Sequence, residues 1–283
     1  MELPKSFKSQ GEHKVCKLVK SLYGLKQASR QWNLKLTHAL LDARFTQSAH
    51  DYSLFFLHQG DDIVIVLAYV DDLLLTGSNA TLIDATKTKL HQQFKMKDLG
   101  NIKYFLGIEV LSSTSGVILN QRKYVLELIS ETGLSGSKPT ITPLESNVRL
   151  TSLKYDQTTG AQGDDLLSDA SSYQRLIGKL MYATITRPDI SFAIYILSQF
   201  MQHPKRSHWE AATRVVRYLK GSIGQGIWLQ DKYSTTLTYW CDSDWAACPR
   251  RLVIGYAVHF GESLISWKSK KQHTVSRSSA KAE

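Results

Sequence analysis

The sequence is poor in cysteine, and its cysteines are not arranged as ligands. It contains 3 of them, Cys16, Cys241 and Cys248, and no CxxC pair. An odd number without such spacing argues against a disulfide framework and a zinc site, and it favours a reducing compartment. The sequence therefore predicts an intracellular protein, cytoplasmic or nuclear or both, and not a secreted one.

Long apolar runs and nucleotide-binding glycine motifs are also missing. The longest apolar run, from Ile63 to Val70, is far shorter than the roughly 20 residues that a membrane helix needs. The first residues lack the apolar centre of a signal peptide. No GxGxxG is present to support a dinucleotide-binding site. We expect no membrane partner.

Positive charge, by contrast, is abundant. Lys and Arg number 35 against 25 Asp and Glu, which gives a formal net charge of +10. A basic surface attracts polyanions, of which nucleic acid is the most common. The length of 283 residues suits two or three domains, and 42% hydrophobic residues suffice for sizeable cores.

Hydrophobic periodicity predicts a mixture of helices and strands. An apolar stripe of Leu25, Trp32, Leu36, Leu40 and Leu41 predicts a helix within 25–45. Further helices are expected at 78–94, capped by Ser78 or Asn79, and at 122–132, 171–186, 188–202 and 205–220. Strands are expected at 53–59, 62–70, 73–77, 104–111, 117–120, 226–230, 236–242, 253–261 and 263–269. The polar residues 137–172 predict a linker or long loop.

The tetrapeptide Tyr69-Val70-Asp71-Asp72 joins two of the apolar strands. Adjacent aspartates repel each other, so holding them at a hairpin tip costs free energy. One explanation is a solvated turn, because aspartate is a favoured turn residue. The other is a magnesium site, because hard carboxylate oxygens are the ligands that Mg²⁺ takes when it also binds substrate phosphates.

An ordered series of motifs surrounds YVDD. The series comprises SLYGLKQASRQW (21–32), FKMKDLG (94–100), YFLGIEV (104–110), RPDISF (187–192), RYLKG (217–221), CDSDWA (241–246) and SLISWKSKK (263–271). In this order the motifs resemble those of copia-type retrotransposon Pol polyproteins over essentially the whole chain. The resemblance implies an RNA-directed DNA polymerase with RNase H, using Mg²⁺ or Mn²⁺, a primer–template of RNA or DNA, and deoxynucleoside triphosphates.

The resemblance also implies a fold and a division into domains. The fold class is α+β: a polymerase palm with an antiparallel sheet backed by helices, a helical thumb and connection, and a partial RNase H-like sheet. The expected boundaries are 1–136 for the fingers and palm remnant with the primer grip and the start of the thumb, 137–172 for the linker, 173–222 for the helical thumb and connection, and 223–283 for the truncated RNase H-like domain.

By similarity, Asp71 is a metal-binding catalytic carboxylate and Asp72 its catalytic neighbour. The implied nucleotide- and template-binding residues are Tyr23, Gly24, Lys26, Gln27, Arg30 and Tyr69. A different explanation of the same segment is a turn at Gly24 followed by a solvated basic helix face. Either Lys95 or Lys97 matches a basic residue near the nucleotide phosphates.

Two further sites are implied by the resemblance. Phe105, Leu106 and Gly107 match the turn that grips the primer end, although an apolar strand edge would also explain them. Asp242 and Glu283 match catalytic, metal-binding carboxylates of RNase H, although an aspartate often simply ends a strand. Lys281 would either pair with Glu283 or weaken its metal affinity.

The resemblance also points to missing chemistry. Residues 1–20 contain no aspartate to supply the second polymerase carboxylate, and the later RNase H carboxylates are absent. We expect a fragment that is inactive alone, binds metal weakly at most, and has a marginally stable C-terminal sheet without a helical cover. A catalytically dead nucleic-acid-binding remnant and a decayed product without a selected role are the alternatives.

Overall fold

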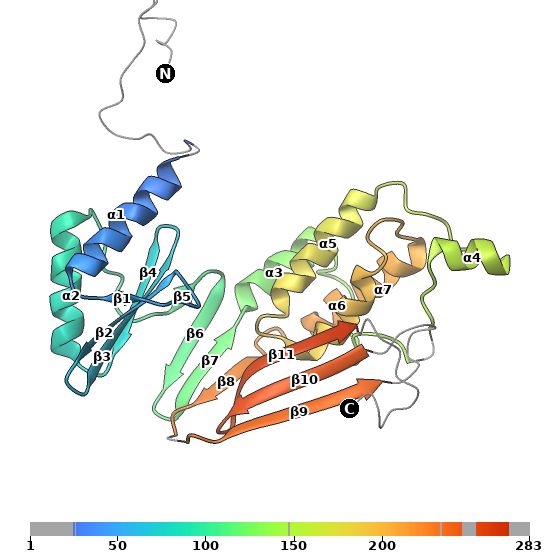
Figure 1. Ribbon diagram of the computed structural model, residues 1–283. Helices are drawn as coiled ribbons and strands as arrows, with labels where there is room; N and C mark the ends of the chain where they lie inside the picture. The colour runs from blue at the N-terminus through green and yellow to red at the C-terminus, as the bar shows by residue number, and fades with distance from the viewer. Residues whose placement is uncertain (1–24, 26, 147, 233, 245–252, 272–283) are drawn as a thin grey trace, which may run out of the picture. The chain divides into compact units, whose positions relative to one another are not determined.

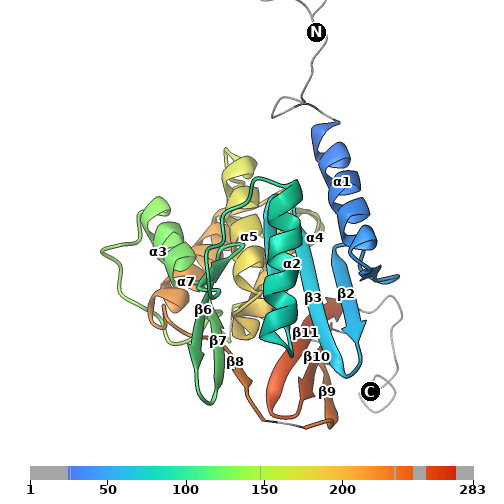
Figure 2. The ribbon, with the colours of Figure 1, turned by 90° about the vertical axis from the view of Figure 1, so that its left-hand side faces the viewer.

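The structure is a computed structural model that describes residues 25, 27–146, 148–232, 234–244 and 253–271. The chain divides into two compact units, Met1–Asn101 and Ile102–Glu283, here called the first and second units. Figures 1 and 2 show helices and antiparallel strands in both units. The expected mixture of helices and antiparallel strands is thus confirmed.

The first unit is a four-stranded antiparallel sheet with two helices. The strands follow the order β1 (Thr46–Gln47), β2 (Leu54–Gln59), β3 (Asp62–Tyr69) and β4 (Asp72–Gly77). Helices α1 (Ala28–Asp42) and α2 (Ala80–Gln93) contribute side chains to the same core as the strands. Asn79 caps α2, since its side chain accepts hydrogen bonds from the backbone N–H groups of Thr81 and Leu82.

The core of the first unit follows from the alternation of side chains along a strand and from their helical repeat along α1. Val64 and Val66 alternate along β3 onto the buried face, and Leu36 and Leu40 are one helical turn apart on α1. The predicted stripe was wrong at Leu25, which precedes α1 and is 42% exposed, and at Leu41, which is 44% exposed. Ala39 takes the place of Leu41, because a stripe continuing at i+3 and i+4 from Leu36 passes through 39 and 40.

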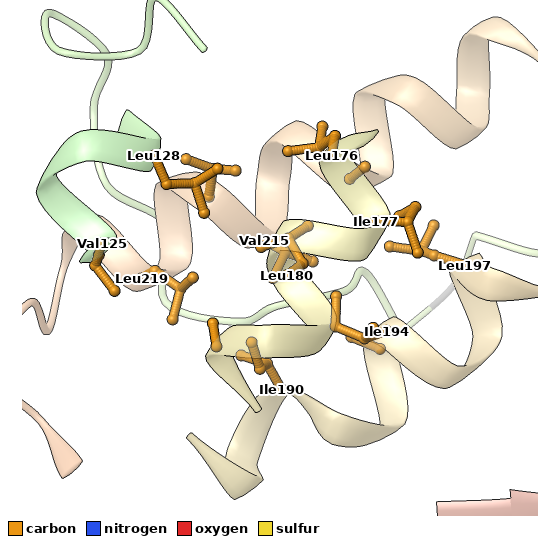
Figure 3. Close-up of a cluster of buried hydrophobic side chains, with 14 of the residues drawn as sticks. Val125, Leu128, Leu176, Ile177, Leu180, Ile190, Ile194, Leu197, Val215 and Leu219 are labelled. Carbon is orange, nitrogen blue, oxygen red and sulfur yellow. The ribbon is translucent and has the colours of Figure 1, made fainter. Parts of the chain in front are cut away.

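The second unit contains a helical core. Its helices are α3 (Arg122–Glu131), α4 (Leu153–Thr159), α5 (Ala170–Ala183), the short 3₁₀ helix η2 (Pro188–Ile190), α6 (Ser191–Ser198) and α7 (Arg206–Lys220). Apolar side chains from α3, α5, η2, α6 and α7 meet in one buried cluster. Figure 3 shows part of this cluster, including Val125 of α3 and Leu219 of α7. Burial of each Val, Leu or Ile side chain in this cluster stabilises the folded unit by roughly 1.5–3 kcal/mol relative to leaving that side chain exposed.

Two sheets accompany these helices. One has the order β5 (Tyr104–Phe105), β6 (Ile108–Ser113), β7 (Gly116–Asn120) and β8 (Gly226–Gln230). The other has the order β11 (Ser263–Lys271), β10 (Val253–Phe260) and β9 (Leu237–Asp244). Because β8 pairs with β7, strands from both sides of the predicted linker share one sheet.

Three expectations for this unit need correction. The strand expected at 104–111 is interrupted by a turn at Leu106 and Gly107, where φ is +50° and +78°. The segment expected to be only a linker contains α4, capped by the Ser152 side chain. The C-terminal sheet does have a helical neighbour, because the Trp267 indole donates to the Thr184 carbonyl, 3.0 Å away, at the end of α5.

Candidate polymerase metal hairpin

The Asp71–Asp72 pair lies at the tip of the hairpin formed by β3 and β4, here called the YVDD hairpin. Tyr69 and Asp72 are the last paired residues, so Val70 and Asp71 form a two-residue loop. Val64 and Val66 anchor one strand in the core, whereas Asp71 and Asp72 are exposed. A rigid apolar base thus presents two carboxylates to solvent.

The loop has an unusual backbone. Val70 has a φ of +50°, and Asp71 is not among the described residues with positive φ. Positive φ at the first loop residue alone is the pattern of a type II′ turn, which favours glycine there. A β-branched residue at positive φ is strained. The Val70 carbonyl accepts a hydrogen bond of 2.7 Å from the indole Nε1 of Trp32 on α1.

The two carboxylates have no described countercharge. Among the residues that the structure describes, no ion pair or hydrogen bond engages the side chain of Asp71 or Asp72. Nor do the described residues contain a cluster of three or more His, Cys, Asp or Glu able to hold a metal ion. Two open carboxylates suit Mg²⁺, which takes only one or two protein carboxylates and fills its remaining positions with water and phosphate.

The other residues predicted to bind nucleotide or template are only partly described. Tyr23, Gly24 and Lys26 lie outside the described residues. Gln27 precedes the first turn of α1, and Arg30 lies in it, both with exposed side chains. Tyr69 is 53% exposed next to the hairpin tip. Gln27, Arg30 and Tyr69 therefore stay predictions with accessible side chains.

Neither candidate lysine after α2 is buried. Lys95 and Lys97 are both exposed, and Phe94 between them and the helix is buried. Asp98 is held by Lys87, at 3.1 Å, and by the backbone N–H of Gly100. The Gly100 and Lys87 bonds keep the pKa of Asp98 below its usual value.

The turn predicted to grip the primer lies in the second unit. Phe105 pairs with Ile108, so Leu106 and Gly107 form a two-residue loop with positive φ at both positions, the pattern of a type I′ turn. The Tyr182 hydroxyl of α5 donates to the Leu106 carbonyl. A Cβ at Gly107 would lie 2.8 Å from the Tyr182 hydroxyl oxygen, so a side chain at this position would displace that hydroxyl.

Of the predicted RNase H carboxylates, only Asp242 is described. It lies on β9 opposite Gly255 of β10, and its side chain is exposed. Glu283 and Lys281 lie outside the described residues, and Cys241 is an exposed free thiol. The pairing of Asp242 with Glu283 therefore stays a prediction.

Sequence reasoning missed two contacts that organise these turns, from Trp32 and from Tyr182. It also missed an ionic cluster around the buried Lys205, here called the Lys205 cluster, which comprises Lys205, Asp156, Asp164, Thr151 and His208. The Lys205 side chain is 1% exposed. Only the β-branched residue in the YVDD turn signalled that something must hold that turn.

Comparison of the sequence with known proteins identifies its family. The family model described as reverse transcriptase (RNA-dependent DNA polymerase) matches residues 1–146. The chain belongs to the reverse transcriptase family, whose members in general use Mg²⁺, nucleic acid templates and deoxynucleoside triphosphates. No solved structure matches the chain.

Similar curated proteins narrow the class to transposon Pol polyproteins. The chain is 43% identical over 271 residues to the Retrovirus-related Pol polyprotein from transposon RE1 of Arabidopsis thaliana and 41% identical to that from transposon RE2. The match covers 95% of this chain but 18% of each polyprotein. The chain is also 39% identical to the uncharacterized mitochondrial protein AtMg00810 of Arabidopsis thaliana, over 77% of this chain and 88% of that protein.

The family and the predicted resemblance therefore agree: the chain contains a reverse transcriptase domain of a transposon Pol polyprotein. No helix in the described part of the chain is long and apolar enough to cross a membrane.

Proposed function

We propose that this chain carries the metal-binding hairpin of an RNA-directed DNA polymerase, joined to part of an RNase H, and that the 283 residues alone do not polymerise. The observation that carries the proposal is the exposed Asp71–Asp72 pair, held on apolar strands without a described countercharge. Such an arrangement leaves the carboxylate oxygens free for a divalent cation.

The residues have distinct proposed roles. Asp71, with Asp72 beside it, would hold Mg²⁺, which when bound stabilises the attacking and leaving oxygens of nucleotidyl transfer. Gln27 and Arg30 would donate to phosphates of the nucleotide or template. Phe105, Leu106 and Gly107 would support the primer end. Asp242, with Glu283, would belong to the RNase H site.

The proposed inactivity follows from the carboxylate count. Two-metal transfer needs carboxylates from more than one strand, and residues 1–20 contain no aspartate to face Asp71. The basic chain, with a net charge of +10, would still bind a primer–template, and that binding would weaken with salt.

Primer extension tests both halves of the proposal. The matched pair is the chain and its Asp71→Asn variant. Each is assayed alone, and each is also assayed after it replaces the corresponding segment of an active reverse transcriptase of this family. Alone, neither protein should extend a primer with Mg²⁺. In the exchanged enzyme, Asp71→Asn should lower kcat about 10³-fold or more, because a metal ligand is lost.

Three results would contradict the proposal. Extension by the chain alone that Asp71→Asn abolishes would show that the 283 residues are sufficient. An exchanged enzyme that extends primers equally well with and without the Asp71→Asn substitution would remove the metal-binding role from the hairpin. Duplex binding that is insensitive to salt would contradict the proposed contribution of the basic surface.

A further inference from the structure

The contact between Trp32 and the YVDD turn joins residues that are 38 positions apart. The indole Nε1 of Trp32 donates to the Val70 carbonyl at 2.7 Å. The buried Phe94 restrains the orientation of the indole, because the two rings pack edge to face at a centroid distance of 5.0 Å. Phe94 in the core therefore contacts Trp32 on α1, and Trp32 in turn bonds to the YVDD turn.

The bonded carbonyl belongs to the peptide that links Val70 to Asp71. Because a peptide group is planar, the direction of this carbonyl sets the direction of the Asp71 N–H and restrains the Asp71 Cα. Val70 is held at positive φ, which an L-residue with a β-branched side chain adopts at a cost. Such strain persists only where the surroundings hold it.

A similar arrangement is found at the second candidate turn. Among the described residues, the non-glycine positions with positive φ are Arg44, Val70 and Leu106. The Leu106 carbonyl accepts from the Tyr182 hydroxyl, just as the Val70 carbonyl accepts from Trp32. Arg44 differs, because it ends α1 through a bond from its own N–H to the Leu41 carbonyl. Both left-handed hairpin residues are thus held by an aromatic donor on a helix.

We propose that Trp32 is a positioning residue that holds Val70 in its left-handed conformation and thereby presents Asp71 beside Asp72 for metal binding. This inference rests on the proposed function of the hairpin. A purely packing role for Trp32 would depend on its ring, whereas the positioning role depends on its N–H. Phenylalanine separates the two, because it keeps an aromatic ring and lacks the donor.

The test is a cycle of the chain and its Trp32→Phe, Val70→Gly and doubly substituted variants. Glycine adopts positive φ without strain, so Val70→Gly should make the turn independent of the indole. The control is Trp267→Phe, which removes an indole bond of 3.0 Å to the Thr184 carbonyl in the second unit. Two quantities are measured by NMR: the three-bond coupling that reports φ at residue 70, and the Mn²⁺ affinity from broadening of the Asp71 and Asp72 amides.

Trp32→Phe should change the Val70 coupling and weaken Mn²⁺ binding about fivefold, the equilibrium factor of one typical hydrogen bond. The double variant should bind Mn²⁺ within about twofold of Val70→Gly, because the indole bond has nothing left to hold once residue 70 is glycine, so the two substitutions should not add. Trp267→Phe should change neither quantity. Protection of the Leu36 and Leu40 amides against hydrogen exchange should persist in Trp32→Phe, which shows that α1 is intact.

An unchanged Val70 coupling in Trp32→Phe would overturn the inference. So would a loss of Mn²⁺ affinity that Val70→Gly does not restore, because that loss would come from packing against Phe94. If the unsubstituted chain shows no Mn²⁺ broadening at Asp71 and Asp72, the proposed metal site fails and the role of Trp32 in metal binding fails with it. The coupling then shows separately whether Trp32 holds the turn.

Discussion

The two units each contain a pair of aspartates, and the pairs differ in their surroundings. In the second unit, Asp156 and Asp164 flank the ammonium group of Lys205, with oxygen–nitrogen distances of 2.5 and 2.9 Å. In the first unit, Asp71 and Asp72 are exposed at a turn with no described cation beside them. The difference separates carboxylates that stabilise the fold from carboxylates that remain free to bind a ligand.

The charged groups of the Lys205 cluster stabilise one another in their ionised forms. The bond from Lys205, followed by that from Thr151, lowers the pKa of Asp156. Burial opposes ionisation of Asp164, but bonds from Ser207 and Lys205 outweigh it and lower the pKa of that carboxyl. Burial likewise opposes the charge on Lys205, yet the two aspartates raise its pKa. The cluster thereby ties the segment around α4 to the start of α7.

The largest predicted effect comes from removing the lysine of this cluster. Lys205→Met should destabilise the second unit by about 3–5 kcal/mol, because it leaves two carboxylates without their buried partner. Urea unfolding followed through hydrogen exchange of α7 amides measures this loss. Lys179→Met is the matched control, since Lys179 pairs with Glu131 while 41% exposed, and it should cost less than about 1 kcal/mol. Equal losses in the two variants would contradict the distinction.

A slightly smaller effect is expected on acidification. Burial, followed by the positive charge of Lys205, lowers the pKa of His208 to about 4, so the folded chain keeps this imidazole neutral. The unfolded chain binds the proton near pH 6.5, so stability falls as the pH drops from 6.5 to 4, by about 1.4 kcal/mol per unit. The aspartates of the cluster add to the loss below their ordinary pKa of 3.8.

This pH dependence is measured by urea unfolding of the chain and of His208→Gln between about pH 7 and pH 4.5. The variant should be less stable at neutral pH and should lack most of the slope, because no imidazole remains to be protonated. A slope that survives in His208→Gln would show that other groups cause it. An Asp71→Asn variant, changed in the exposed pair, should keep the full slope.

The smallest effect is expected at the exposed pair itself. Replacing Asp71 or Asp72 with asparagine removes a like-charge repulsion and no described bond, so stability should stay the same or rise by about 0.5 kcal/mol at most. Thermal unfolding in the absence of divalent ions measures this change. A loss of more than about 1 kcal/mol would mean that the carboxylates stabilise the hairpin and would remove the contrast with Asp156 and Asp164.

The sequence predicted the elements with strong periodicity. The apolar run within 62–70 corresponds to β3, and Asn79, one of the two candidate caps, corresponds to the start of α2. These features are local, so neighbouring residues are sufficient to determine them. The motif series also led to the reverse transcriptase family, which the family model confirms.

Local sequence patterns did not predict the features that depend on distant residues. The pairing of β8 with β7 joins strands that lie on either side of the whole helical segment, which no local periodicity reports. Lys205 is buried although lysine is almost always exposed, and only its two distant aspartates explain this. The Trp32–Val70 bond likewise depends on how α1 lies against the hairpin, so the motif predicted the acidic tip but not the residue that holds its turn.

The exposed pair, Asp71 and Asp72, should bind metal, whereas Asp156 and Asp164, which are paired with Lys205, should not. One titration of the chain with Mn²⁺, followed by amide broadening along the whole chain, tests both halves of this contrast. We predict broadening centred on Asp71 and Asp72 and none centred on Asp156 and Asp164. Broadening at the Lys205 cluster with none at the hairpin would contradict the account.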